Sequence, residues 1–308
     1  MTRGLGLLVV VILLMGCAAG PQLGAVDEEE HLSSGIWDVE AGQRLSVEEF
    51  VDHLEQAQYV LVGESHGDRW HHEVQRVIYS ELSDRKPGRV ALGMEMIEAR
   101  FQDELDRYLA GELDEEQMLD AVQWSKRWGV DPEEYAPMWR RAKQEGQAVV
   151  GLNARRELVR AVGQQGLEGL SEEEETELPE IDDGDGDINT AYRQYLREIF
   201  AAHGNHGQAE GFERFFQAQL VWDETMAHHA FSFLDRGEAE QMVILAGRGH
   251  VERGWGIPSR LERRGADEEA VITVVPVTTE GPRAEAMEGH RKLSWLQGEE
   301  IADFVWIQ

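Results

Sequence analysis

Histidine and glutamate side chains directly follow a run of β-favouring residues in the first third of the chain. The segment Tyr59–Leu82 reads YVLVGESHGDRWHHEVQRVIYSEL, which places Glu64 and His66 where the β-favouring run ends and His71 and His72 shortly afterwards. Imidazole and carboxylate groups can transfer protons together or bind a divalent metal ion. The cluster therefore predicts a hydrolytic, metal or cofactor site at the end of a strand.

Similar polar residues end three other apolar runs. Glu95 lies within GMEM, Asn153 within GLNARR, and His250 closes AGRGH. In a parallel α/β sheet, ligands bind where the carboxyl ends of the strands converge. One such residue alone is more often a cap or a structural group, but the recurrence favours a shared pocket. We expect the catalytic residues of a hydrolase there to be Glu64, His66, Glu95 and His250. A divalent metal (Zn, Mn or Co) would be bound by His66, Glu95 and His250.

A helix face carries the next polar group. His71 and Gln75 are spaced at i, i+4 and His72 and Gln75 at i, i+3, so these side chains share one side of the predicted helix. That side could hold a ligand, or hydrogen-bond back to the strand-end carboxylates. Alternatively, one histidine is buried against the sheet and the other is solvated.

The stretch QLVWDETMAHHA carries Trp222, Met226 and His229 at helical spacing. By default this stripe packs in the core. The acidic pair Asp223 and Glu224 lies at its edge, where a carboxylate could orient a histidine.

Composition excludes several classes of protein. The formal net charge is −31, from 60 acidic and 29 basic residues, which argues against nucleic-acid binding because phosphate contacts need clustered cations. Cys17 is the only cysteine. It can form no disulfide within the chain, and no second thiolate is available for zinc, haem or nucleophilic catalysis. Sequence signatures of serine hydrolases, phosphate-binding loops, zinc proteases and haem attachment are absent.

The N-terminus has the features of a secretory signal. An apolar stretch, Leu5–Met15, is too short to span a bilayer and is followed by LLMGC. The residues before Cys17 resemble a bacterial lipobox, which implies a signal peptide over 1–16 and an acylated cysteine followed by a flexible tether over 17–34. An ordinary secretory signal is the alternative. With Ala18 rather than aspartate next, we expect a lipid-anchored cell-envelope protein at the outer membrane.

Strand and helix patterns alternate through the rest of the chain. Apolar runs predict five strands, at Tyr59–Gly63, Arg89–Met96, Ala148–Asn153, Gln241–Ala246 and Ala270–Val277. Helical periodicity lies around Asp68–Lys86, Glu98–Ala110, Asp114–Ala121, Pro132–Gly146, Arg155–Gly163, Thr190–His203, Gln208–Asp235 and Pro258–Gly265, and Ser46 is placed to cap another helix through Gln56. This alternation predicts an α/β fold with a mainly parallel sheet flanked by helices.

Two connections are longer than one crossover helix requires. We predict an α/β domain over 36–278, with helical cap insertions at about 97–147 and 155–240. An acidic run, 171–187, divides the second insertion and predicts a mobile surface loop. The remainder, 279–308, is expected to be a C-terminal extension whose last residues, IADFVWIQ, could form an edge strand.

Five motifs together resemble the ChaN family of haem-binding lipoproteins, within a superfamily that includes the TIKI proteases and erythromycin esterases. The motifs are LVGESHGDRWHHEVQ, ALGMEM, YAPMWRRAKQEGQAVVGLNARRELVRAV, QAQLVWDETMA and VILAGRGHVERGWGIPSRL, and the resemblance runs from about Ile36 to Val277. It implies an α/β core with a helical cap, and a dimer that holds haem between subunits. The superfamily's Gly-x-x-His histidine falls on His66, and its later carboxylate and histidine fall on Glu95 and His250. Gly67-Asp68 replaces an Asp-Asn pair that many relatives have.

The leading hypothesis is a haem-binding lipoprotein of iron acquisition, with an outer-membrane haem receptor as a partner. Candidate cofactor-binding residues are His71, His72, Gln75, Tyr135, Asn153, Trp222 and Met226. Without a thiolate, the axial ligand of ferric haem would be Tyr, His or Met, and the candidates in the cap are Tyr135, Tyr192, Tyr195, His203, His206, His228 and His229. A metal-dependent or general-base hydrolase is the second hypothesis, and a non-catalytic envelope scaffold is the third.

Overall fold

The computed structural model describes residues 32–202, 209–280, 296–298 and 300–308. The strands in these ranges are β1 (Gly35–Asp38), β2 (Gln43–Leu45), β3 (Tyr59–Glu64), β4 (Val90–Glu98), β5 (Val149–Asn153), β6 (Gln241–Gly247), β7 (Val271–Val277) and β8 (Phe304–Ile307). They form one eight-stranded sheet in the order β2-β1-β8-β7-β3-β6-β4-β5. Neighbouring strands from β8 to β5 are parallel, whereas β1 pairs antiparallel with β8 and with β2. The predicted α/β fold with a mainly parallel sheet is confirmed.

The C-terminal strand lies inside the sheet. The pattern IADFVWIQ predicts a strand at the edge, and that position was wrong, because β8 is bonded to β7 on one side and to β1 on the other. Beyond β1 lies β2, which is the edge strand on this side of the sheet, and the apolar patterns predicted neither of these two short strands. The polar sequence of β2, Gln43–Leu45, has no buried residue, so it carries no strand-like run.

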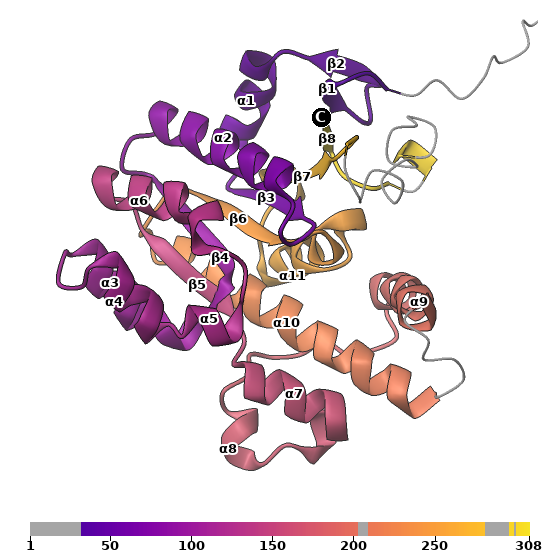
Figure 1. Cartoon of the computed structure of the whole chain (residues 1–308). Coiled ribbons are helices and arrows are strands. Elements are labelled where there is room, and N and C mark those ends of the chain that lie inside the picture. Colours follow the sequence, from indigo (N-terminus) through magenta and orange to yellow (C-terminus); the bar gives the residue numbers. More distant parts are fainter. Residues whose placement is uncertain (1–31, 203–208, 281–295, 299) are drawn as a thin grey trace, which may run out of the picture. The chain divides into compact units, whose positions relative to one another are not determined.

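Alternate residues of the central strands pack into two separate cores. Val60 and Val62 of β3 face one core, and Tyr59 and Leu61 face the other. Helices α1 (Val47–Gln56), α2 (Arg69–Arg85) and α6 (Ala136–Glu145) cover the first face, and α10 (Ala209–Asp235) and α11 (Ile257–Arg264) cover the second (Figure 1). Each fully buried aliphatic side chain contributes about 1.5–3 kcal/mol, so both faces of the sheet stabilise the fold.

Helix α1 begins as its sequence predicts. The Ser46 side chain accepts from the Glu49 N–H, and the Glu49 carboxylate accepts from the Ser46 N–H at 2.8 Å. This reciprocal capping satisfies two donors at the helix start. Leu54 and Phe50 then lie on the buried side of the helix.

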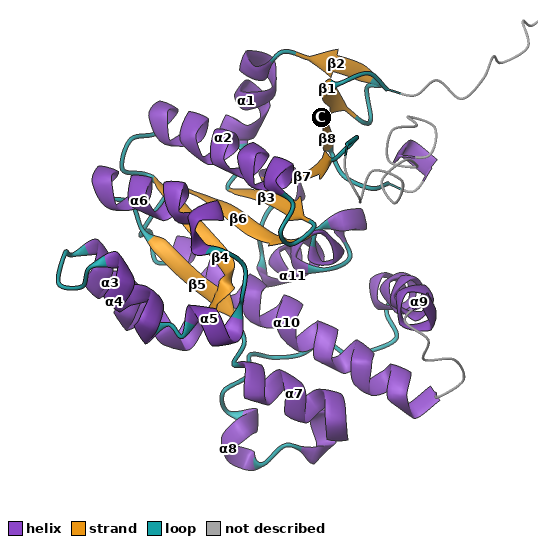
Figure 2. Ribbon diagram, viewed as in Figure 1, coloured by secondary structure: helices purple, strands orange, loops and turns teal. Residues whose placement is uncertain are grey.

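Helices fill both long connections between strands (Figure 2). The first holds α3 (Gln102–Leu109), α4 (Glu115–Ala121) and α5 (Trp124–Arg127) before α6, and the second holds α7 (Arg156–Gln165), α8 (Glu172–Glu175) and α9 (Asp187–Ala202) before α10. Short 3₁₀ turns occur at Ala99–Phe101, Pro132–Glu134, Leu167–Gly169, Arg248–His250, Glu252–Gly254 and Glu268–Ala270. The 27 residues of α10 give it a length of about 40 Å. Its C-terminal half packs on the sheet, and its N-terminal half packs against α7 and α9.

The acidic run is attached to the helices beside it. The Asp182 N–H donates to the buried Glu224 carboxylate at 3.3 Å, and the Glu180 carbonyl accepts from Arg263 at 3.3 Å. Its carboxylates are mostly exposed, as predicted for a surface segment. These bonds, with a third from Arg264 to the Glu180 carbonyl, nevertheless hold its backbone to α10 and α11.

Some predicted features lie outside the described residues: the signal peptide, Cys17, the tether up to residue 31, and His203 and His206. Within the described ranges, no helix combines the length and the hydropathy needed to cross a bilayer.

Candidate functional site

The carboxyl ends of the strands border a cavity of about 410 Å³, the strand-end cavity. It is lined by His66, Glu95, Met96, Glu98, Arg127, Trp128, Asn153, Ala154, Arg156, Gln219, Trp222 and His250. The structure thus brings together His66, Glu95 and His250, which come from three separate segments of the sequence. Asn153 and Trp222, predicted to contact a cofactor, line the same cavity.

Glu64 ends β3 and holds His66 from behind. Its Oε1 lies 2.8 Å from His66 Nδ1 and accepts from the Tyr135 hydroxyl at 2.6 Å, and its Oε2 accepts from the Gln75 amide at 2.9 Å. Only 1% of Glu64 is exposed. Burial alone would raise the pKa of this carboxyl, but hydrogen bonds from two imidazoles and the Tyr135 hydroxyl hold the pKa down at about 2. The carboxylate is therefore ionised, and His66 must donate through Nδ1.

This arrangement decides which nitrogen of His66 can do chemistry. With Nδ1 donating to Glu64, Nε2 carries the lone pair whenever the ring is neutral. Burial works to lower the pKa of His66, but the hydrogen bond to Glu64 and the charge of Glu95 outweigh it, so the pKa is raised. The ring packs edge-on against Trp128, with centroids 4.7 Å apart.

The histidines of α2 lie behind this pair and do not line the strand-end cavity. His71 Nδ1 accepts from the Ser65 N–H at 2.8 Å, and burial lowers its pKa to about 4, so the neutral ring holds the loop that carries His66. His72 Nε2 lies 3.4 Å from Glu64 Oε2, and its Nδ1 lies 2.6 Å from Glu134 Oε2. His72 and Gln75 together fix the position of the Glu64 carboxylate.

Glu95 extends from β4 toward the opposite face of the sheet from Glu64. Its Oε2 accepts from the Gly247 N–H at 2.5 Å. A Cβ at position 247 would lie 3.0 Å from His66 Cε1 and 3.5 Å from Glu95 Oε2. Glycine is needed here because any side chain would push against the His66 ring. The glycine-rich stretch after β6 therefore lets two of the predicted site residues approach each other.

Asp223 holds His250 in the same way as Glu64 holds His66. Asp223 is fully buried on α10, with Oδ1 2.6 Å from His250 Nδ1 and Oδ2 accepting from the Tyr192 hydroxyl at 2.9 Å. Burial alone would lower the pKa of His250, but the charges of Asp223 and Glu95 raise it to about 9. Asp223 was predicted from the sequence as a carboxylate that could orient a histidine, and in the structure that histidine is His250.

The strand-end cavity can support acid–base chemistry. His250 Nε2 lies 3.8 Å from Glu95 Oε1, so a protonated imidazole and a carboxylate face the cavity together with His66. His250 stays protonated through neutral pH, and His66 in its neutral form offers Nε2 as a base. Across the described residues, no group of three or more His, Cys, Asp or Glu side chains has the arrangement of a metal site. The metal ligand set His66, Glu95 and His250 stays a prediction.

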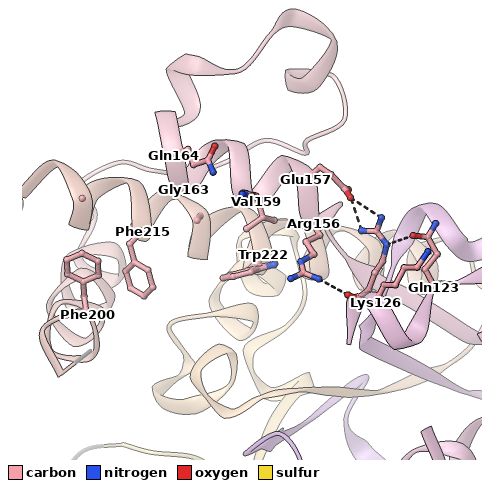
Figure 3. Close-up of a pocket in the computed structure, with 14 residues that line it drawn as sticks. Gln123, Lys126, Arg156, Glu157, Val159, Gly163, Gln164, Phe200, Phe215 and Trp222 are labelled. Atoms are coloured by element: carbon pink, nitrogen blue, oxygen red, sulfur yellow. Dashed lines mark hydrogen bonds and ion pairs between the residues drawn. The ribbon is translucent and has the colours of Figure 1, made fainter. Parts of the chain in front are cut away.

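A larger hollow, the α7–α10 cleft, has a volume of about 930 Å³. It is lined by Gln123, Lys126, Arg127, Arg156, Glu157, Val159, Arg160, Gly163, Gln164, Phe200, Gly211, Phe215, Ala218 and Trp222. Figure 3 shows Phe200 and Phe215 at one end, Trp222 and Val159 in the middle, and Lys126 beside Arg156 at the other end. The cleft shares Arg127, Arg156 and Trp222 with the strand-end cavity, so the two hollows adjoin.

The predicted axial ligands within the described residues line neither of these hollows. The hydroxyls of Tyr135 and Tyr192 donate to carboxylates, and that of Tyr195 donates to Glu252 at 3.4 Å. Met226 is buried in the core between α10 and the sheet. His228 and His229 contact each other farther along α10.

Of the residues that line the cleft, only Trp222 was predicted from the sequence as a site residue. Arg156, Arg160 and Gly163 recur at i, i+4 and i+7, so one side of α7 carries cations beside a residue without a side chain. In the sequence alone this is the pattern of an ordinary solvated helix face, whose apolar side, Leu158, Val159 and Val162, packs inward, so it did not predict a cleft. Trp128 was not predicted as a site residue either, because a single tryptophan in a sequence is usually a core residue.

Three comparisons place the chain among known proteins. A family model described as haem-binding uptake, Tiki superfamily, ChaN matches residues 50–261. The solved structure of ChaN of Campylobacter jejuni, described as showing cofacial haem binding, has a TM-score of 0.65 and 16% identity, covering 88% of this chain and 94% of that one.

Two further matches cover less of this chain. An erythromycin esterase mutant, EreC, in its open conformation, matches with a TM-score of 0.44 and 12% identity over 80% of this chain and 76% of that one. Protein RETICULATA-RELATED 5, chloroplastic, of Arabidopsis thaliana is 25% identical over 235 residues, which are 73% of this chain and 29% of that protein. The chain therefore spans less than a third of that relative's length.

Proposed function

Because the chain belongs to the haem-binding ChaN family of the Tiki superfamily, we propose that it binds haem in the α7–α10 cleft. Haem has a flat apolar macrocycle with two propionate groups on one edge, and a fitting site needs apolar walls and cations at one end. The cleft has both, with Trp222, Phe200 and Phe215 along its length and Lys126 and Arg156 at one end. This separation of aromatic and cationic residues is the observation that carries the proposal.

The strand-end cavity adjoins this cleft and contains candidate donors for the iron. His66, Met96 and His250 line it, whereas the described lining of the cleft includes no histidine, tyrosine or methionine. His250 stays protonated while Asp223 holds it, which disfavours it as a ligand. Both histidines present Nε2 with a carboxylate behind Nδ1, the arrangement found at many metal-bound histidines, but only His250 has its pKa raised as far as about 9. His66 is therefore the favoured axial donor.

A substitution at Gly163 tests the proposed location. A Cβ at this position would meet no atom within 4 Å, so a side chain there projects into open space in the cleft. We expect Gly163→Trp to fill the cleft and weaken haemin binding at least about tenfold, measured by Soret absorbance titration of the purified full chain. Gly163→Ala is the matched control and should bind as the wild type does. Unchanged binding by a folded Gly163→Trp variant would place haem elsewhere.

The strand-end cavity supports hydrolysis as a second candidate function. The observation that favours it is the convergence of two carboxylate-held imidazoles with Glu95 in one cavity. Turnover of carboxylic esters or peptides that is lost in His66→Ala, in protein with no bound haem, would support this function. If a panel of esters and peptides shows no turnover while the protein still binds haem, hydrolysis is rejected and haem binding remains as the proposed function.

We also propose that Cys17 is acylated and that the protein is held at a membrane of the cell envelope, in the outer membrane, as part of iron acquisition. The support is the apolar stretch and the LLMGC sequence before Cys17. A homodimer around haem and an outer-membrane haem receptor are the partners proposed with it. Partition into a detergent phase by the wild type, lost in Cys17→Ser, tests the anchor. Equal partition of both would contradict it.

A further inference from the structure

We propose that Lys126, Arg156 and Arg160 form a carboxylate clamp that binds the propionates of haem and fixes its orientation in the α7–α10 cleft. The inference rests on the proposed function. Lys126, Arg156 and Arg160 would recognise haem by the edge that carries its two propionate groups.

The three cations have no carboxylate partner within the described ranges. Lys126 and Arg156 are exposed, and the Arg156 guanidinium donates only to the Lys126 carbonyl, at 2.8 Å. That bond holds the Arg156 side chain against the backbone of Lys126, and both residues lie at the same end of the cleft (Figure 3). Arg160 lies one turn farther along α7 and also lines the cleft.

Their sequence neighbours behave differently. Arg127, next to Lys126, lies 2.5 Å from Glu98 and 2.9 Å from Glu157. Arg155, next to Arg156, lies 2.7 Å from Glu177. In a chain with a net charge of −31, carboxylates are abundant, so three cations without a carboxylate partner gathered at one cavity favour an anionic ligand there.

The placement also predicts the orientation of bound haem. The propionate edge would face Lys126 and Arg156, and the opposite, apolar edge would face Phe200 and Phe215. Since Arg156 lines the strand-end cavity as well, the carboxylate end of the ligand would lie at the boundary between the two hollows.

The test compares haemin with haemin dimethyl ester, in which both propionates are neutral, in one detergent solution. Absorbance titrations of the full chain would give dissociation constants for the wild type, for Lys126→Gln, Arg156→Gln and Arg160→Gln, and for the triple variant. We expect each single variant to bind haemin about two- to fivefold more weakly, and the triple variant about tenfold or more. Arg155→Gln is the matched control, because it removes the same charge from a paired arginine.

The clamp predicts that the wild type prefers haemin over its ester and that the triple variant has lost this preference while still binding the ester as the wild type does. Higher salt should weaken haemin binding by the wild type and leave ester binding nearly unchanged. A triple variant that keeps the preference would overturn the clamp and leave haem binding standing. A wild type that binds neither ligand would reject the proposed function and the clamp together.

Discussion

Three histidines near the strand ends have different protonation properties because each has a different environment. His71 has a lowered pKa because burial dominates and its Nδ1 accepts a backbone hydrogen bond. His66 and His250 have raised pKa values, because each donates to a buried carboxylate. Sequence spacing identified these residues as a group, but it could not assign their protonation, which depends on contacts from other segments.

Removing the carboxylate behind His250 should reverse the shift in its pKa. In Asp223→Asn, the ring remains buried without its anionic partner, so we expect the pKa of His250 to fall from about 9 to near or below 6.5. Histidine titration by NMR measures it directly. Asp235→Asn, at the exposed end of the same helix, is the control. A His250 pKa that stays near 9 in Asp223→Asn would contradict the assigned cause.

The same histidine predicts a pH dependence of stability. Because the folded pKa of about 9 exceeds the unfolded value of 6.5, protonated His250 stabilises the fold fully below pH 6.5, and this contribution is lost as the pH rises through 9. It amounts to about 3 kcal/mol for a shift of this size. The difference in unfolding free energy between the wild type and His250→Gln should therefore shrink between pH 6.5 and 9. A difference that is constant over this range would argue against the raised pKa.

At the scale of elements, apolar runs predicted β3 to β7 within one or two residues at each end, and Ser46 predicted the start of α1. The order of the strands in the sheet could not be predicted from the sequence. The pattern of Phe304–Ile307 indicates a strand, but only the hydrogen bonds to β7 and β1 place it inside the sheet. The sequence likewise supplied His66, Glu95 and His250 as site residues, but the cleft depends on how α7 lies beside α10, which local patterns do not encode.

The internal position of β8 makes a stability prediction. Val305 is fully buried between two strands, so Val305→Asp should destabilise the fold by more than about 3 kcal/mol, because it buries a charge without a partner. Gln43→Asp in the exposed edge strand β2 should change stability by less than about 0.5 kcal/mol. Denaturant unfolding would measure both. Similar small effects would mean that β8 is dispensable.

Two glycines near helix ends should respond to alanine with opposite signs. Gly163 lies inside α7 with open space around it, so Gly163→Ala should stabilise the protein by up to about 1 kcal/mol through helix propensity. Gly146 ends α6 with a φ of +66°, so Gly146→Ala should destabilise it by about 1 kcal/mol. Thermal melts of the two variants would show shifts in opposite directions. Destabilisation by Gly163→Ala would mean that this position is not open.

At the scale of the molecule, net charge and local charge differ. A total of −31 describes an acidic protein, yet Lys126, Arg127, Arg156 and Arg160 line one cleft with a single carboxylate, Glu157. Composition alone would argue against an anionic ligand. The fold instead gathers cations from α5 and α7 beside the aromatic side chains of α9 and α10, and this arrangement supports an amphipathic ligand with carboxylate groups.

The position of the iron tests the central claim most directly. Crystals of the haem-loaded protein, with diffraction recorded on both sides of the iron absorption edge, would locate the metal without assuming how the ligand is oriented. We expect one anomalous peak per chain in the α7–α10 cleft, beside Trp222 and within reach of the strand-end cavity. A peak on another surface, with the cleft filled by solvent, would contradict the account.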